Sequence, residues 1–525
     1  MDIIERDESG RVNSTRIVNH QISRSSNNGS EKRARTRSSA TEILSKVFLP
    51  VGYPRSVSPD YLRYQILNSL QAFCSSLAGL LSSRATLEGY GVGKASASAT
   101  NALILSIMQD MFARLTTIIS AYYLGSSLFP EAKTYRFLAD ILNDAAIILD
   151  TTSPMLATVF PFHLLATSRI PFQLYTLCIS ASLRSLCGIA AGGSKTAITM
   201  HFATPLEGSG DVGDLNAKDS SKETVLGLLG MLLGTITVPY LTTTWSTYTV
   251  LFLLVFLHLL INYYGVRGIV LRTLNRHRAS LAWAAFRHDF GEKKKNEERS
   301  HESNPSRVLT PSSIASYERL FDRPDLLWDI HASRTIGRCT MGSSIGLVFD
   351  VAQADIFPAT RLFDLFRNKS FVVWFDPKDL TSTASSSEPS LRDKHSPHVH
   401  VFLKENHTPS DQLKAWLISC EVALLLASQQ LKTDENDEDA SVSLDALVLI
   451  SRAKDTVDRL FSTFTEQMLR AGWCADTNMQ NKSPENDEGN DKGSQPCLAV
   501  ALMTRPPQTV VVDVSSTEEE AKKDR

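Results

Sequence analysis

The sequence predicts a mainly α-helical protein. A helical membrane-associated domain with one or two transmembrane helices is followed by a smaller cytosolic α+β domain. Three observations support this prediction: an uncharged apolar run, helical periodicity over the N-terminal half, and strand-like segments after residue 313. A chain of 525 residues can bury more than one core, so several domains are expected.

The apolar run extends from Thr224 to Val266 without any Asp, Glu, Lys or Arg. It divides into Val225–Leu241 and Trp245–Tyr264, each close to the roughly 20 residues that span a bilayer. A basic cluster beginning at Arg267 follows at once, which is typical of the cytosolic end of a transmembrane helix. We therefore expect an intracellular membrane protein whose N-terminal arm and C-terminal domain are cytosolic. One span instead of two, or a helical hairpin buried in a soluble core, are the alternatives.

Composition divides the rest of the chain into regions. Polar, Ser- and Arg-rich or acidic segments lack the apolar residues that a core requires, so both ends are expected to be disordered. The predicted regions are a disordered arm (1–42), the helical domain (43–285, with its apolar membrane region 225–264), a linker (286–313), the α+β domain (314–476) and a disordered acidic tail (477–525).

Local signals place several elements. Ser58 followed by Pro59 is a favourable helix start, and Ser220 with Glu223 forms a capping box ahead of the apolar run. In the α+β domain, alternation and β-branched residues predict strands at 345–351, 371–375 and 398–403. Longer amphipathic patterns predict helices at 411–431 and 443–472.

Two predicted helices carry charges within otherwise apolar segments. Asp110 and Arg114 lie one turn apart on the helix 101–124, and Arg136, Asp140 and Asp144 follow each other on the helix 134–149. Charges in an apolar environment are costly unless they are paired, so these five residues are our candidates for a buried charge network. A solvated helix face, or a path for a substrate or a proton, are the alternatives.

Motifs for enzymatic chemistry are weak. The segments Gly89–Lys94 and Gly188–Thr196 resemble phosphate loops, but each departs from the required spacing or residue types and is better explained as a turn. Four histidines could be mistaken for metal ligands: His395, His398, His400 and His407. His398 and His400 would lie on one face of a strand, but no cysteine or pair of carboxylates nearby completes a metal site. We predict no catalytic residue and no metal site, and we assign no cofactor.

Charge and cysteine content narrow the class of protein. A formal net charge of −2 gives no general footprint for nucleic acid, so none is expected as a partner. Seven cysteines without a Cys-x-x-Cys pair suggest reduced intracellular thiols. A mean hydropathy of −0.09 argues against a transporter embedded throughout its length. The expected partner is a lipid membrane, with a related family member or another protein as a further candidate.

Four ordered segments together resemble a known family. They are FLPVGYPRSVSPDYLRYQ (48–65), LLSSRATLEGYGVGKASA (80–97), YRFLADILNDAAIILD (135–150) and DLNAKDSSKETVLGLLG (214–230). The chain resembles the root UVB sensitive family, whose characteristic domain is linked to vitamin B6 photo-protection and homoeostasis. The resemblance runs from about Phe48 to Arg272, and more loosely to Trp473.

The resemblance implies a function but no site residues. It implies a membrane-associated, non-enzymatic protein with a role in vitamin B6 homoeostasis, and the molecular activity stays open. Two alternatives are a small-molecule transporter or carrier that uses the charged helices 101–124 and 134–149, and a cofactor-binding enzyme. The ligand, the membrane and the oligomeric state are not specified by the sequence.

Overall fold

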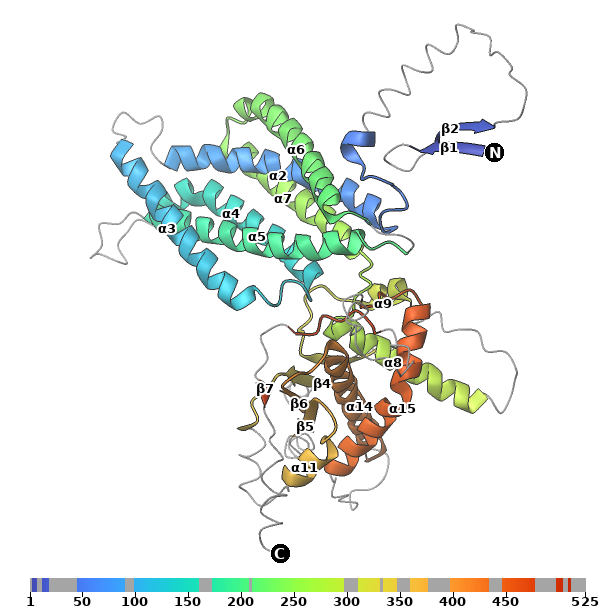
Figure 1. Cartoon of the computed structure of the whole chain (residues 1–525). Coiled ribbons are helices and arrows are strands. Elements are labelled where there is room, and N and C mark those ends of the chain that lie inside the picture. The colour runs from blue at the N-terminus through green and yellow to red at the C-terminus, as the bar shows by residue number, and fades with distance from the viewer. Residues whose placement is uncertain are drawn as a thin grey trace, which may run out of the picture. The chain divides into compact units, whose positions relative to one another are not determined.

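The chain folds into two compact units, divided after Val270 (Figure 1). The computed structural model describes residues 2–6, 12–17, 45–89, 99–159, 172–206, 210–296, 310–330, 334–346, 359–375, 397–433, 446–476, 497–503 and 509–510. Mainly helical structure, with a small sheet in the C-terminal part, agrees with the predicted fold class. The division precedes the predicted end of the helical domain at 285, because the helix that begins at Arg276 belongs to the second unit.

Six long helices make up most of the described part of the first unit. They are α2 (Tyr61–Gly89), α3 (Ala99–Leu124), α4 (Ala132–Val159), α5 (Phe172–Phe202), α6 (Val212–Thr237) and α7 (Thr244–Arg267). Helix α4 packs along α5, α2 contacts α4, α6 and α7, and α3 packs against α5 (Figure 1). Within the expected disordered arm, β1 (Asp2–Arg6) and β2 (Val12–Ile17) pair as an antiparallel hairpin.

Two helix starts differ from the sequence prediction. Helix α2 begins at Tyr61 instead of Pro59, because the Ser58 hydroxyl donates to the side chain of Asp60 (2.5 Å). Helix α6 begins at Val212, where Asp211 accepts hydrogen bonds from two backbone amides of the first turn. The predicted capping box therefore lies inside α6.

The apolar run is interrupted at the predicted place. Helix α6 ends at Thr237, a 3₁₀ turn (η1, Val238–Tyr240) follows, and α7 begins at Thr244. The Thr243 hydroxyl caps α7 by accepting from the Ser246 amide (3.2 Å). The two predicted transmembrane segments thus form separate helices.

The second unit packs helices against a mixed sheet. The sheet consists of β3 (Leu326–Asp329), β4 (Arg334–Met341), β5 (Phe371–Phe375), β6 (His398–Lys404) and β7 (Thr509–Val510). Its order is β3-β4-β6-β5, in which β4 and β6 run parallel, and β7 pairs with the end of β6. The helices are α8 (Arg276–Asn296), α9 (Pro311–Tyr317), α11 (Ala359–Leu365), α14 (Pro409–Thr433) and α15 (Ala446–Arg470).

The sheet was only partly predicted. Strands β5 and β6 coincide with the predicted strands at 371–375 and 398–403. Strands β3 and β4 were missed, because their residues show little alternation. Of the strand predicted at 345–351, Ile345 lies in a turn, Gly346 is helical and the rest lies outside the described residues.

The core of the second unit is large and aromatic. Helix α14 lies on the sheet and also contacts α8 and α15. Three tryptophans, Trp283, Trp374 and Trp416, are almost fully buried there. Burial of such side chains is the main source of stability in a water-soluble fold.

Candidate functional site

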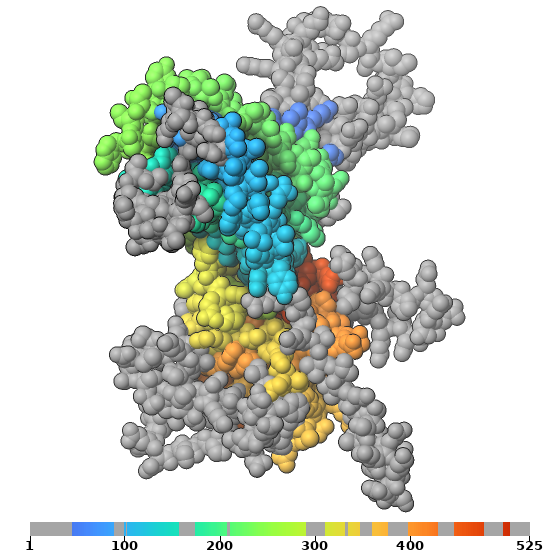
Figure 2. Space-filling model, turned by 90° about the vertical axis from the view of Figure 1, so that its left-hand side faces the viewer, coloured from blue at the N-terminus to red at the C-terminus, as the bar shows by residue number. Residues whose placement is uncertain are grey.

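The helical unit exposes apolar side chains over much of its surface. Helix α3 lies along one face of the unit in Figure 2, and none of its most apolar stretch is buried. Helices α6 and α7 likewise expose large apolar residues, among them Leu232, Trp245 and Phe256. Soluble proteins rarely expose apolar surface this extensive, whereas a lipid-facing surface is apolar by necessity.

Four described helices are long and apolar enough to cross a membrane. They comprise Ala102–Leu124, Leu174–Phe202, Val212–Tyr240 and Thr244–Arg267. Only the last two were predicted from the sequence. The other two were not predicted, because Asp110, Arg114, Arg184 and Lys195 interrupt their apolar character.

The interior of the same unit is polar. On α4, Asp140 and Asp144 project toward α7, where Asn262 and His258 face them from successive turns, and Arg136 lies one turn before Asp140 on the same helix. His258 Nδ1 lies 2.7 Å from Asp144 Oδ2, and both side chains are buried. The Asn262 amide donates to Asp140. The structure thus brings together three of the five residues proposed for a buried charge network.

Helix α2 closes the network from a third side. Arg136 donates to Asn68 Oδ1 (2.9 Å) and lies 3.9 Å from Asp140. The Gln71 side chain lies beside Arg136, Asp140 and His258. In the amide orientation that suits these neighbours, it donates to Asp140 (3.2 Å) and to His258 (3.0 Å), and it accepts from Arg136 (2.9 Å).

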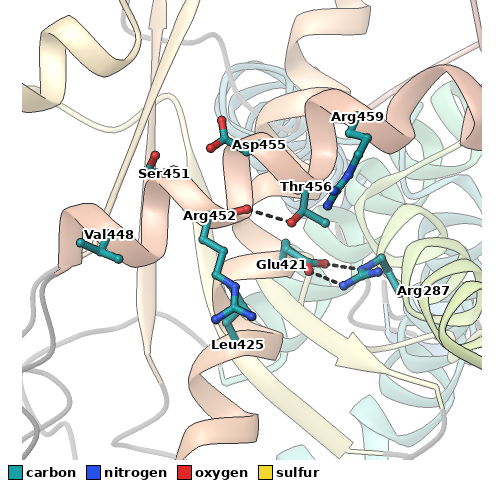
Figure 3. A pocket seen from close by; sticks show the side chains of 9 residues that line it. All are labelled: Arg287, Glu421, Leu425, Val448, Ser451, Arg452, Asp455, Thr456 and Arg459. Carbon is teal, nitrogen blue, oxygen red and sulfur yellow. Dashed lines mark hydrogen bonds and ion pairs between the residues drawn. The ribbon is translucent and has the colours of Figure 1, made fainter. Parts of the chain in front are cut away.

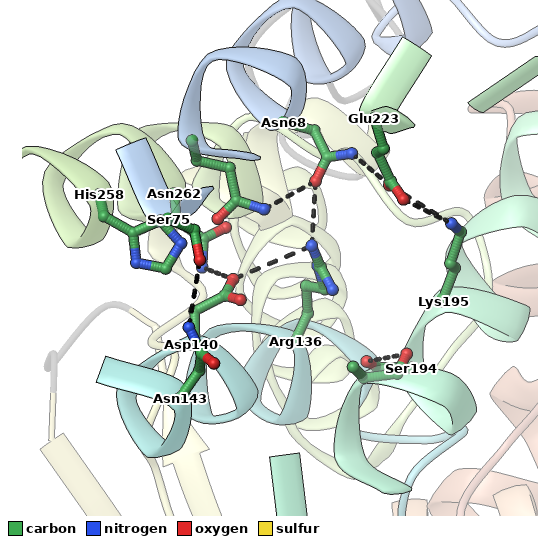
Figure 4. A network of polar contacts seen from close by, with 12 residues as sticks. Asn68, Ser75, Arg136, Asp140, Asn143, Ser194, Lys195, Glu223, His258 and Asn262 are labelled. Atoms are coloured by element: carbon green, nitrogen blue, oxygen red, sulfur yellow. Dashed lines mark hydrogen bonds and ion pairs between the residues drawn. The ribbon is translucent and has the colours of Figure 1, made fainter. Parts of the chain in front are cut away.

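The network continues across the bundle to α5 and α6 (Figure 4). The Asn68 amide donates to Glu223 on α6 (2.8 Å), and Glu223 in turn pairs with Lys195 on α5 (3.2 Å). Hydrogen-bonded and charged side chains therefore connect five helices, from His258 on α7 to Lys195 on α5. Arg136 lies near the middle of this path.

The charge balance of the network depends on one proton. It contains the carboxylates of Asp140, Asp144 and Glu223 but only two permanent cations, those of Arg136 and Lys195. Protonation of His258 would therefore bring the net charge of the network to zero. Because a net charge is costly in a low-dielectric interior, proton binding and cation binding are both natural ways to stabilise this site.

A second polar cluster joins the start of α2 to α6. The Tyr61 hydroxyl donates to Asp219 (3.0 Å), and the Gln65 amide donates to the other oxygen of the same carboxylate (2.6 Å). Lys222 donates to both Tyr61 (2.7 Å) and Asp219 (3.0 Å). All of the partners of this buried carboxylate are thus supplied by α2 and α6.

A third cluster joins the chain before α2 to the ends of α5 and α7. Asp60 lies 3.1 Å from His201 Nε2 and accepts from the Val270 amide (2.8 Å). Burial acts to raise the pKa of Asp60, but His201, the Ser58 hydroxyl and this amide outweigh it. The pKa therefore lies below the ordinary 3.8.

The last cluster lies at the far end of α2. Asp150 on α4 pairs with Arg184 on α5, and Ser82 on α2 bonds to both, donating to Asp150 (3.1 Å) and accepting from Arg184 (2.9 Å). The polar positions of α2 follow helical spacing along one face: Tyr61, Gln65, Asn68, Gln71, Ser75 and Ser82. Sequence reasoning missed this stripe because it considered only charged residues, although the spacing was visible.

The structure does not bring Asp110 and Arg114 into the network. They pair with each other at 2.8 Å on α3, with 61% and 76% of their side chains exposed. The stripe on α3 faces outward, because this helix contacts the unit mainly through α5. Spacing alone could not distinguish this exposed pair from the buried residues of α4.

The other candidate sites are explained by local structure. Gly188–Thr196 lies within the continuous helix α5 instead of forming a turn, and Lys195 serves the network. Of the Gly89–Lys94 segment, Gly89 ends α2 and the remainder lies outside the described residues, as does His395. His398 and His400 bond to Thr340 and Ser343, and His407 to a backbone carbonyl.

The basic cluster after the apolar run is largely used by the second unit. Arg272 donates to the Gly472 carbonyl (2.7 Å), and Arg278 pairs with Glu318 (2.8 Å). Arg276 and His277 are also buried in that unit. Arg267 remains at the end of α7, so the cluster carries less information about membrane orientation than its sequence indicated.

Comparisons with known proteins agree with the resemblance. A model described as "Vitamin B6 photo-protection and homoeostasis domain" matches residues 34–289, and one described as "Root UVB sensitive protein, C-terminal" matches 384–482. No solved structure matches the chain significantly.

Relatives are found in Dictyostelium discoideum and Arabidopsis thaliana. "RUS family member 1" of Dictyostelium discoideum is 35% identical over 47% of this chain and 45% of its own length. "Protein root UVB sensitive 3" of Arabidopsis thaliana is 30% identical over 52% and 55%, and "Protein root UVB sensitive 2, chloroplastic" is 22% identical over 82% and 81%. The match to the first two covers about half of their length. The chain belongs to the root UVB sensitive family.

Proposed function

We propose that this protein is an integral membrane protein whose helical unit binds a small polar molecule of the vitamin B6 class in its interior and carries it without chemical conversion. One observation supports this most: apolar side chains face outward while paired charges lie inside. That distribution is expected for a bundle in lipid that surrounds a polar site.

Transport is now the better-supported form of this proposal. The mean hydropathy of the whole chain argues against transport, but four described helices have the length and composition of membrane spans. The network also reaches across five helices, which is the arrangement a polar pathway requires. Membrane orientation with a cytosolic second unit is part of the proposal. Cysteines introduced at positions 30 and 300 should both react with an impermeant reagent from the cytosolic side.

The direct test is reconstitution. The full-length protein in liposomes is assayed for uptake of labelled pyridoxine and pyridoxal, in parallel with binding in detergent. We expect saturable uptake, which is lost in Asp140→Asn at an equal level of folded protein. The matched control is the double variant Asp110→Asn/Arg114→Gln on α3, which removes both members of an ion pair outside the network and should transport normally.

The alternatives give different results. Saturable binding without uptake would indicate a sensor or a storage protein and would overturn the transport form. A changed molecule at the end of the assay would indicate an enzyme. Equal loss in Asp140→Asn and in the double variant Asp110→Asn/Arg114→Gln would show that the network has no special role.

A further inference from the structure

The second unit contains a surface groove that the proposed function does not use. It has a volume of about 520 Å³ and lies between α8, α14 and α15 (Figure 3). Its floor is the carboxylate of Glu421 on α14, which is buried and accepts two hydrogen bonds from Arg287 on α8 (2.9 and 2.8 Å) and one from Trp283 (3.2 Å). These bonds neutralise Glu421 and hold Arg287 in a fixed orientation.

Two further arginines of the groove lack an acidic partner. Arg452 and Arg459 lie seven residues apart on α15 and therefore on the same face of the helix. Neither forms an ion pair or a side-chain hydrogen bond with any residue that the structure describes. Figure 3 shows them on either side of the Arg287–Glu421 pair, with the end of the Arg452 side chain beside Leu425 and that of Arg459 beside Thr456. Two guanidinium groups thus flank a place where the local carboxylate is already neutralised.

Neutral hydrogen-bonding groups and an apolar end complete the groove. Ser451 and Thr456 contribute hydroxyls; that of Thr456 donates to the Arg452 carbonyl (2.9 Å), and that of Ser451 has no partner within the described part of the chain. Leu425 and Val448 line one side, and Val448 is exposed. The groove therefore offers charge and hydrogen bonds beside an apolar surface.

We propose that this groove binds the phosphate of a small phosphate monoester that has an apolar or aromatic body. Arg452 and Arg459 would hold the phosphate oxygens, because a guanidinium presents paired N–H groups that match phosphate geometry. The Ser451 hydroxyl would donate to a third oxygen, and Leu425 and Val448 would contact the body. Asp455, on the same stretch of α15, opposes the ligand by its charge and moderates its affinity.

The probe is phenyl phosphate, titrated calorimetrically into the full-length protein in detergent. We expect saturable binding that weakens as salt is raised, weaker binding of inorganic phosphate and still weaker binding of phenol. Arg452→Gln and Arg459→Gln should each weaken phenyl phosphate by about tenfold, as expected for loss of one charge-assisted contact. Asp455→Asn should bind it more tightly, because this change removes a repulsive charge.

The matched control is Arg470→Gln. Arg470 lies on the same helix, is exposed and pairs with Glu466, outside the groove. Its replacement removes the same charge from α15 and should leave binding unchanged. Equal affinity of the wild type and the double variant Arg452→Gln/Arg459→Gln would overturn the proposal, as would equal weakening by Arg470→Gln. Absence of binding at millimolar phenyl phosphate would overturn it too. Circular dichroism of each variant verifies that these exposed substitutions leave the fold intact.

Discussion

The two units distribute the same kinds of residue in opposite ways. In the second unit, tryptophans and phenylalanines fill the core, and most charges lie at the surface. In the helical unit, Asp140, Asp144 and His258 are buried while leucines and phenylalanines of α3, α6 and α7 face outward. Because each arrangement places the costly groups away from one kind of solvent, the difference is consistent with the proposed placement of the helical unit in lipid.

The comparison also explains how each unit is held together. Burial of apolar area stabilises the second unit, as in other water-soluble domains. Lipid provides no such driving force between helices, so in the proposed membrane placement close packing and hydrogen bonds between helices would stabilise the first unit. The polar face of α2, which bonds to α4, α5 and α6, has this role.

The largest predicted effect comes from placing a charge on the exposed apolar surface of each unit in turn. Phe256 on α7 is 60% exposed and Phe321 in the second unit is 54% exposed, so they form a matched pair. Phe256→Arg should prevent membrane insertion, since an arginine in mid-span costs about 2.5–3.5 kcal/mol on insertion scales. Carbonate extraction of membranes measures this: the variant should leave the pellet, while Phe321→Arg should stay in it. If both variants stay in the pellet, the α7 surface does not face lipid.

The next largest effect concerns the buried network. Asp140→Ala removes the acceptor of Asn262 and the carboxylate that pairs with Arg136, so a buried guanidinium loses its ion-pair partner. We expect a loss of about 3–5 kcal/mol in the free energy of unfolding. Thermal and denaturant unfolding in detergent would measure it. The control is the double variant Asp110→Ala/Arg114→Ala, which removes both charges of the exposed pair on α3 and leaves neither without its partner, so it should have little effect. Similar stability of both variants would contradict the structural importance of the network.

The secondary structure and the buried network differ in how far the sequence could predict them. Helical content, the break at Thr242–Thr244 and strands β5 and β6 follow from local patterns of apolar residues and turns. The network does not, because the partners His258, Asn68 and Glu223 come from helices far apart in sequence. Helical spacing located Arg136, Asp140 and Asp144 correctly on one face, but spacing contains no information about which face points inward.

A smaller effect is a difference between the two units in how their stability depends on pH. Burial lowers the pKa of His277 below its ordinary 6.5. Glu318 and Asp322 act to raise this pKa, but burial, with a smaller contribution from Arg278 and Arg319, outweighs them. A lowered folded-state pKa means that the neutral form is stabilised. This contribution is therefore complete above pH 6.5 and is lost as the pH falls toward the folded-state value.

We therefore expect the second unit to lose stability between pH 7 and pH 5. Asp60 in the helical unit stays ionised over this range, since its folded-state pKa lies below 3.8. His277→Phe would retain a ring against Trp328 and remove the titration, so its melting temperature should depend less on pH. Tryptophan fluorescence during thermal unfolding reports mainly on this unit, because Trp283, Trp328, Trp374 and Trp416 lie in it. An unchanged pH profile in His277→Phe would exclude this histidine as the cause.

The smallest predicted effect tests the comparison within one helix. Ser82 and Ser83 are neighbours on α2, but Ser82 faces the Asp150–Arg184 pair while the Ser83 hydroxyl bonds only to its own helix, at the Gly79 carbonyl (2.8 Å). Ser82→Ala removes one donor and one acceptor from an ion pair whose carboxylate is buried and whose arginine is 45% exposed, and the two charges remain together. We expect it to destabilise the unit by about 1 kcal/mol, the usual value of one buried hydrogen bond. Ser83→Ala should be neutral or slightly stabilising, since alanine favours the helix. Unfolding of the two variants in detergent provides the measurement, and a larger loss for Ser83→Ala would show that the polar interior has been placed on the wrong face of α2.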